Sequence, residues 1–254
     1  MGTVLRRVAA RPRDYVRVAG PDAEDFLQRM LSNDVTAAPC EALLLTSKAR
    51  VIAPVVVARR QEDFLLLTEP GLGETVIATL TRARFAAKVS IEAEQHESVV
   101  LMGSDPMSGV LSTPNREFGE PAVEVIDSHL EPTLSEAEMQ RMRIEAGIPA
   151  WGKEIDDSIL PAEAGLDETH VSFTKGCYPG QEPIARLHHR GKVNRRLRVL
   201  AVDSARPGDE IRYREKVVGR VTSAIDGRAL GYIRVEVPDD AELAVGTAKA
   251  RSLH

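Results

Sequence analysis

The sequence predicts an α+β protein with two successive α+β units followed by a small β-barrel. Up to about residue 190, short β-branched or leucine-rich runs alternate with amphipathic helices in two units of similar length. After Arg196 only short alternating segments at close spacing follow, and this pattern is typical of a small barrel. A chain of 254 residues is long enough for two or three such units. We therefore place the units at residues 1–95, 96–190 and 191–254.

The first unit combines two amphipathic helices with short strands. One helix opens at the Gly-Pro-Asp segment of residues 20–22, where proline suits the first turn, and ends near residue 32. The second covers residues 70–85. The strands are expected at residues 13–18, 42–45, 51–58, 64–68 and 88–94. Pro54 lies inside one of them and indicates an edge strand or a bulge.

The second unit repeats this plan, so the two form a pseudo-duplicated, ferredoxin-like pair, although no strong internal sequence repeat accompanies it. Its strands are expected at residues 98–102 and 122–126, and residues 104–119 are irregular. Ser135 and Glu138 form a capping box that starts a helix ending near Ala146. The barrel strands are expected at residues 197–202, 210–213, 216–223, 228–237 and 247–252.

Composition excludes several classes of protein. The net charge of −5 does not indicate a nucleic-acid or membrane binder, so nucleic acid is an unexpected partner unless a local patch binds it. No apolar run approaches the length of a membrane span. Two cysteines far apart in sequence make no disulfide framework, which favours a reducing, cytoplasmic setting.

Cys177 lies in the most unusual stretch, between Lys175-Gly176 and Pro179-Gly180. Glycine and proline on both sides of a thiol indicate a tight loop that presents sulfur. Lys175 can lower the pKa of a neighbouring thiol, which would make Cys177 a functional residue. A small buried residue in a turn is the plain alternative. One cysteine cannot hold an iron–sulfur cluster, so any cluster chemistry would be transient or shared with a partner.

A basic run follows this loop. It contains Arg186, Arg190, Lys192, Arg195, Arg196 and Arg198, with His188 and His189. Such a run can bind phosphate or polycarboxylate, and a solvated linker entering the barrel explains it equally well. The sequence has no zinc, P-loop or dinucleotide motif, so we predict no metal site. Trp151, the single tryptophan, either anchors a loop or walls a planar ligand.

Several segments resemble one known family. Residues 175–182, Lys-Gly-Cys-Tyr-Pro-Gly-Gln-Glu, closely resemble the K-G-C-[FY]-x-G-Q-E signature of the YgfZ-type folate-binding proteins, which are related to the glycine-cleavage T protein. Further resemblances are Phe-Leu-Gln at 26–28 with Asn33-Asp34, residues 143–149, residues 160–166, and Arg186. Together they cover nearly the whole chain.

The resemblance implies three subdomains around a central channel that holds tetrahydrofolate. By match to the T protein, Glu120 would contact the pterin and Arg143 would hold the folate, with Asn33, Trp151 and Arg186 as further cofactor-binding candidates. It also implies a role as an accessory protein in iron–sulfur cluster assembly or repair. The partners would then be folate and iron–sulfur assembly proteins or cluster-containing client enzymes.

One departure from the T protein matters for activity. Its paired aspartates are replaced here by Ala53-Pro54, which cannot orient a reacting amine. A folate-dependent accessory role is therefore favoured, and aminomethyl transfer is the alternative. An RNA-binding role through the basic run is a third hypothesis. Folate form, partners and oligomeric state are left open by the sequence.

Overall fold

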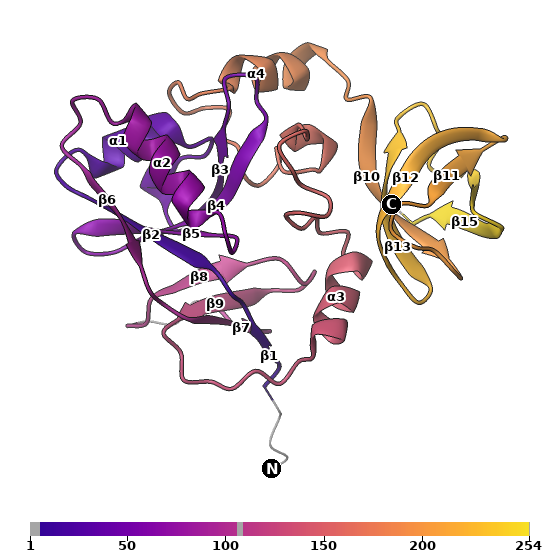
Figure 1. Ribbon diagram of the computed structural model, residues 1–254, viewed down its shortest axis with the longest axis horizontal. Coiled ribbons are helices and arrows are strands. Elements are labelled where there is room, and N and C mark those ends of the chain that lie inside the picture. Colours follow the sequence, from indigo (N-terminus) through magenta and orange to yellow (C-terminus); the bar gives the residue numbers. More distant parts are fainter. Residues whose placement is uncertain (1–5, 106–108, 254) are drawn as a thin grey trace.

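The first of three parts is a five-stranded antiparallel sheet with two helices on one face (Figure 1). The computed structural model describes residues 6–105 and 109–253. The strands, in the order β3-β4-β5-β2-β6, are β3 (Cys40–Leu45), β4 (Val51–Arg59), β5 (Asp63–Thr68), β2 (Asp14–Ala19) and β6 (Ser90–Glu94). The helices are α1 (Ala23–Met30) and α2 (Gly73–Ala83), and a short 3-10 turn, η1 (Val35–Ala37), leads into β3.

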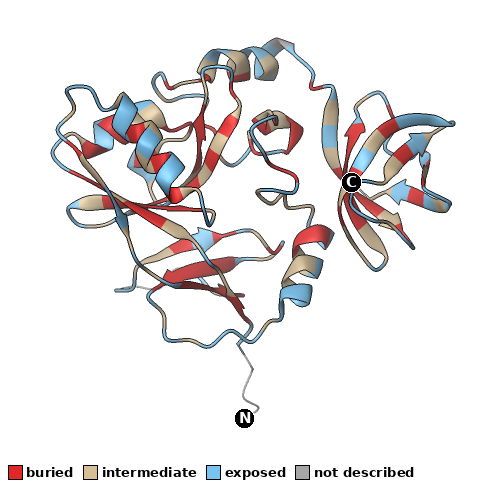
Figure 2. Cartoon of the chain, in the orientation of Figure 1, coloured by how far each residue is buried: buried red, intermediate tan, exposed pale blue. Residues whose placement is uncertain are grey.

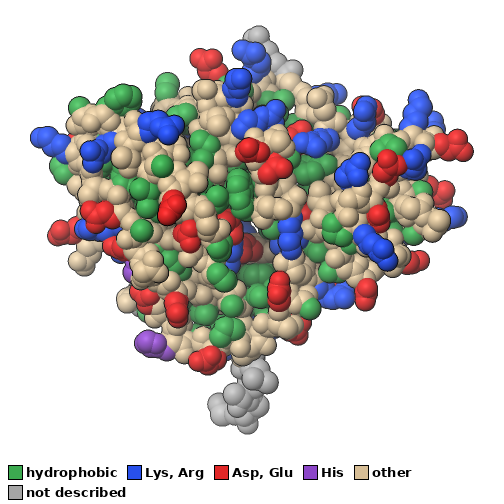
Figure 3. Space-filling model, viewed as in Figure 1, with side chains coloured by type: hydrophobic (Ala, Val, Ile, Leu, Met, Phe, Trp, Pro, Cys, Tyr) green, Lys and Arg blue, Asp and Glu red, His purple; other side chains and the backbone are tan. Residues whose placement is uncertain are grey.

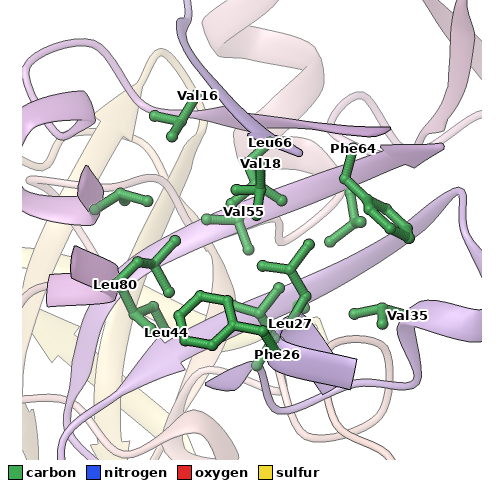
Figure 4. Close-up of a cluster of buried hydrophobic side chains, with 14 of the residues drawn as sticks. Val16, Val18, Phe26, Leu27, Val35, Leu44, Val55, Phe64, Leu66 and Leu80 are labelled. Carbon is green, nitrogen blue, oxygen red and sulfur yellow. The ribbon is translucent and has the colours of Figure 1, made fainter. Parts of the chain in front are cut away.

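The helices are held by the apolar stripes that the sequence predicts. Phe26 and Leu27 of α1 and Leu80 of α2 are buried against strand residues such as Val55 and Leu66 (Figure 4). Burying each such side chain contributes about 1.5–3 kcal/mol. This cluster fixes the position of α1, and the carbonyl oxygen of Leu31 at the end of α1 accepts a hydrogen bond from Lys175.

The second part is a four-stranded sheet to which the N-terminal residues contribute a strand. Its order is β1-β7-β9-β8, with β1 (Val8–Ala10), β7 (Ser98–Met102), β9 (Ala122–Ile126) and β8 (Ser112–Asn115). Strands β7 and β9 are buried on both faces (Figure 2). The helix α3 (Glu136–Glu145) begins with the predicted capping box of Ser135 and Glu138. Its Ile144 packs on Val199 and Leu230 and so joins this part to the barrel.

The third part is a closed six-stranded barrel. The strands run in the order β10-β13-β12-β11-β14-β15. They are β10 (Arg195–Val202), β11 (Glu210–Tyr213), β12 (Lys216–Ile225), β13 (Arg228–Arg234), β14 (Glu242–Val245) and β15 (Ala248–Ser252). Closure leaves no free sheet edge. The predicted fold class, α+β with a C-terminal barrel, is confirmed.

Residues 147–190 run through the middle of the molecule and connect all three parts (Figure 1). They include the 3-10 turn η2 (Pro161–Glu163) and the helix α4 (Gln181–Arg190). Apolar residues of this segment, among them Ile155, Leu166 and Tyr178, pack on the β3–β4 hairpin of the first sheet. The division at residues 95 and 190 stays a prediction, and in space the first two units are interleaved.

Three strands and one α-helix go beyond the sequence expectation, namely β1, β8, β14 and α4, and so do the two 3-10 turns η1 and η2. Pro54 has no backbone N–H to donate, and it lies where β4 is paired on one side only. The pairing of β4 with β5 ends at Val55 opposite Thr68, so Pro54 has a neighbour on one side only and lies beside a bulge in the β3–β4 ladder. No helix in the described part of the chain is long and apolar enough to span a membrane.

Gly180 seats the start of α4 on the turn between β3 and β4. Its φ is 83°, and a Cβ added there would lie 2.6 Å from the Thr46 carbonyl oxygen and 3.0 Å from the Ala49 Cα. Both atoms belong to backbone, so the neighbour cannot move aside cheaply. Glycine is required at this position for conformation and for space.

We expect Gly180→Ala to lower the free energy of unfolding by about 3 kcal/mol, the sum of left-handed strain and backbone overlap. Gly227→Ala is the matched control, because Gly227 has φ 80° but open space around its Cα. It should cost only the strain, about 1–2 kcal/mol. Urea unfolding of both variants checks this, and equal losses would contradict the close seating of α4.

Candidate functional site

A central cavity of about 440 Å³ lies between the first two sheets, residues 147–170 and the barrel. The surface is hollowed near the middle of the face shown in Figure 3, where acidic and basic side chains meet. The volume falls within the range usual for small-molecule sites.

The floor of the cavity is a buried ionic network. Arg13, on the chain between β1 and β2, donates bidentately to Glu124 at 3.0 and 2.9 Å, and also to Glu117 and Glu69. Burial alone would lower the pKa of Arg13, but Glu124, Glu117 and Glu69 outweigh it and raise the pKa. Burial alone would raise the pKa of Glu117, but Arg11 and Arg13 hold it below its ordinary value. These charges satisfy one another and keep the floor rigid.

Glu41 is a largely buried cavity carboxylate that has acceptor capacity left. Among the described residues its side chain has one partner, Arg116 at 3.6 Å, and it is 19% exposed. Burial raises the pKa of Glu41, and Arg116 offsets part of this. Nearby, burial lowers the pKa of His170 to about 4, so its imidazole is neutral at pH 7. A ligand N–H group facing Glu41 would therefore meet an under-used acceptor.

The remaining walls are largely apolar. Pro54, Val55 and Val56 of β4 line one side, and Trp151 lines another. Strand β4 thus presents no polar side chain at Pro54, where the T-protein resemblance would place an aspartate. A planar ring system could pack against such walls while its polar edge reaches the charged floor.

The Cys177 loop is rigidly supported although its thiol is exposed. The Lys175 Nζ donates to the carbonyl oxygens of Leu31 and Asn33, both at 2.7 Å, at the end of α1. Tyr178 is buried against the β3–β4 hairpin, and Gly180 packs closely against the turn of the same hairpin. No hydrogen bond joins Lys175 to Cys177 in the described part of the chain, so the lysine anchors the loop.

The second cysteine lies in a different environment. Cys40 is half-buried and lines a smaller opening of about 200 Å³, together with Asn33. This opening shares Glu41 and Arg116 with the central cavity. Burial raises the pKa of Cys40 to about 11, so it is a thiol at neutral pH.

Arg143 is committed to the protein interior. It donates to the Ile148 carbonyl oxygen at 2.7 Å, to Glu154 at 2.8 Å and to Ser223 at 2.9 Å, and its side chain is 8% exposed. It does not line the central cavity. The structure therefore gives Arg143 a structural role between α3 and the barrel, and the folate contact inferred from the resemblance stays a prediction.

The other candidates fall into two groups. Trp151 lines the cavity and Asn33 the side opening, where the Asn33 side chain donates to the carbonyls of Glu41 and Thr169. Glu120 lies in the β8–β9 turn, paired with Arg7 at 2.6 Å, and outside the cavity lining. Arg186 is exposed on α4. The structure brings Trp151, Asn33 and the Lys175 loop together, but not Glu120 or Arg143.

The sequence reasoning missed Glu41 and Glu154. Glu41 lies near the start of β3, next to its apolar residues, and no motif singles it out. Glu154 lies in a polar loop, and its side chain is 0% exposed only because α3 and the barrel close over it. A single glutamate carries no sequence signal of burial, so only the three-dimensional arrangement reveals these two.

Comparison with known proteins agrees with this geometry. The family described as "CAF17, C-terminal beta-barrel domain" matches residues 194–252. The glycine cleavage system aminomethyltransferase T from Bartonella henselae superposes with a TM-score of 0.82 at 20% identity, covering 98% of this chain and 85% of that one. The chain therefore has the T-protein fold with a CAF17-type barrel.

Relatives in sequence show more closely which known proteins this chain is similar to. A tRNA-modifying protein YgfZ from Cronobacter sakazakii is 24% identical over 85% of this chain and 80% of its own. The iron–sulfur cluster assembly factor IBA57, mitochondrial, from Homo sapiens is 28% identical over 73% of this chain and 63% of its own, so the match leaves over a third of that protein uncovered. The predicted resemblance is confirmed: this chain is a relative of the YgfZ and IBA57 proteins.

The environment of Lys175 makes a testable pH prediction. Burial lowers the pKa of Lys175 from 10.5 to about 8, and Asp34 offsets part of this. A lowered pKa means more free amine at a given pH, so acetylation of Lys175 should rise with a midpoint near pH 8. Mass spectrometry of protein labelled across pH 6–11 checks it, and a midpoint near 10.5 would show that the ammonium is not desolvated.

Proposed function

We propose that the central cavity binds a reduced folate and that the chain acts in iron–sulfur cluster assembly or repair, with Cys177 as its functional thiol. The main support for this proposal is that one continuous segment of the chain connects the cavity to the thiol. Residues 162–170 line the cavity, and the same segment continues into the loop that presents Cys177. The names of the YgfZ and IBA57 relatives support a role in cluster assembly or tRNA modification.

The cavity suits a pterin in its shape and its polarity. Its volume of about 440 Å³, the Trp151 wall and the apolar face of β4 match a planar ring. Glu41 has an acceptor free to receive the N–H groups at the pterin edge. Neutral His170 adds no competing positive charge there. We assign Glu41 the contact for which the sequence resemblance suggested Glu120.

Cys177 is accessible and held in place, which is what a thiol that meets a partner requires. Its loop is anchored by Lys175 at the end of α1 and by Gly180 at the β3–β4 turn. Within the described residues no group of three or more His, Cys, Asp or Glu side chains is arranged to hold a metal ion. A cluster or cluster-containing enzyme would then supply the other ligands.

Aminomethyl transfer is the weaker hypothesis. Such a transfer needs a group that orients a reacting amine, and the three residues of β4 that line the cavity, Pro54, Val55 and Val56, are all apolar. Folate in this chain would then be a carried or sensed ligand and not a one-carbon substrate processed by the protein.

A role in tRNA modification is the second candidate, because the bacterial relatives carry that name and the chain has a basic run. Two of its arginines are already paired: Arg195 with Glu163 at 3.1 Å, and Arg198 with Asp239 at 3.0 Å. Direct tRNA binding would show a steep loss of affinity with salt. Filter binding at rising salt concentration decides this, and a flat response would leave an indirect role only.

Titration with tetrahydrofolate tests the cavity assignment. We expect binding by the wild type, and about tenfold weaker binding by Glu41→Gln, because a charge-assisted hydrogen bond is lost. Glu74→Gln, on the exposed surface of α2, is the matched control and should bind normally. Normal binding by Glu41→Gln would refute its role, and no binding by the wild type would refute the folate site.

Complementation of a deletion strain tests the thiol. Cys177→Ala should fold and bind tetrahydrofolate like the wild type, because its side chain is exposed, yet fail to restore the activities of cluster-containing enzymes. Cys40→Ala, which removes the half-buried thiol, should restore them. Full restoration by Cys177→Ala would show that the thiol is dispensable.

A further inference from the structure

We propose that the turn at residues 84–87, directly after α2, is a binding site for single-stranded nucleic acid. Phe85 in this turn stacks on one base, and the neighbouring Arg82, Arg84 and Lys88 hold the phosphates beside it. None of these residues lines the central cavity or the side opening, so the inference is independent of the folate assignment.

Neither backbone preference nor packing explains Phe85. The Ala87 amide donates to the Arg84 carbonyl oxygen at 2.9 Å, which closes a turn with Phe85 at its second position. The φ of Phe85 is 45°, a left-handed value that glycine adopts far more easily than a bulky residue. Its side chain is 92% exposed and gains no packing that would offset this strain. Strain of this kind points to a residue whose function lies outside the fold.

The charges in the segment around Phe85 are all of one sign. Residues 75–91 contain no acid and three cations, namely Arg82, Arg84 and Lys88. All three are exposed, and none of them forms an ion pair within the part of the chain that the structure describes. Arg84 donates to the Val89 carbonyl oxygen at 3.4 Å. Asp22 contacts the segment, but its carboxylate accepts from the Lys88 backbone amide and not from the ammonium group.

This combination fits a nucleotide better than a membrane or a protein. One exposed ring between cations supplies what an unstacked nucleotide needs: a flat apolar face for the base and positive charges for the phosphates. Membrane attachment takes more apolar surface, because even a myristoyl chain binds a bilayer only marginally. A stable protein interface needs about 800 Å² on each side, much more than one ring offers. With a net charge of −5 on the whole chain, binding of nucleic acid depends on such a local patch.

Fluorescence anisotropy with a labelled single strand of about twelve nucleotides tests the site. At about 50 mM salt the wild type should bind with a dissociation constant on the order of 10 µM. Phe85→Ala should weaken this binding about tenfold, because stacking on the ring is lost, and should leave the binding of a duplex of the same length unchanged. RNA and DNA strands of the same sequence are titrated in parallel, and the tighter of the two identifies the sugar chemistry of the ligand.

Two further variants separate binding from folding. Phe85→Gly removes the ring and suits the left-handed φ, so it should lose binding like Phe85→Ala and unfold at the same urea concentration as the wild type or a higher one. Phe85→Trp keeps a stacking face and should bind at least as tightly as the wild type. A lower urea midpoint in Phe85→Gly would give the ring a structural role and contradict the inference.

The salt dependence of binding tests the cations. Two or three phosphate contacts should give a slope of log affinity against log salt concentration of about −1.4 to −2. Arg82→Gln and Lys88→Gln should each reduce the magnitude of this slope by about 0.7. Lys249→Gln removes an exposed charge from the barrel strand β15 and is the matched control, which should keep the wild-type slope.

Several outcomes would overturn the site. They are absence of binding by the wild type, binding that Phe85→Ala leaves unchanged, and a loss of binding in Arg196→Gln alone, which would place the contact in the basic run. Sedimentation with phosphatidylglycerol vesicles is the remaining arm: binding of vesicles without binding of oligonucleotides would make the patch a membrane contact. Each of these outcomes leaves the tetrahydrofolate titration untouched, so the folate proposal is decided separately.

Discussion

The buried carboxylate of Glu154 holds the parts of this molecule in their relative positions. One of its oxygens accepts from Arg143 of α3 and from the Ala150 amide, and the other accepts from Ser223 of β12 at 2.6 Å. Its backbone carbonyl accepts from Tyr232 of β13 at 2.8 Å. A buried charge is tolerated only when its partners are complete, so α3, the central segment and the barrel must meet in one arrangement. The central cavity borders this junction, because Ile148, Pro149 and Ile155 line it.

Charge in this protein is divided between structure and recognition. Arginines that close the parts on one another, such as Arg13 and Arg143, are buried and bound by several acceptors. Among the described residues, Arg186 of α4 and Arg196 of β10 are exposed and have no such acceptor. The T-protein fold can therefore keep a stable ionic interior and change its ligand by altering a few cavity residues, since function depends on the site and not on the fold. Pro54 on β4 occupies the position where the resemblance to the T protein would place an aspartate.

Much of the fold could be predicted from the sequence, because long apolar stripes such as those of α1 and α2 determine which face is buried. The capping box of Ser135 and Glu138 is also predictable from the sequence. Strands β1, β8 and β14 have three or four residues each, too few for a period to appear. Helix α4 has Ile184 and Leu187 as its large apolar residues amid charged ones, and so resembles a linker. In the site, the Cys177 loop was predicted from its glycines, whereas the cavity contacts depend on distant segments meeting.

The strand β1 ties the beginning of the chain to its middle. Val8 pairs with Leu101, so the four-stranded sheet gains its edge strand from residues that precede the whole first sheet. Without β1, strand β7, which is apolar and buried along its length, would become an open edge with unpaired amides. Neither unit is thus a separable module: a fragment cut between them would expose a surface that recruits other chains. During synthesis, the residues of β1 can pair in the sheet only after β7 has been made.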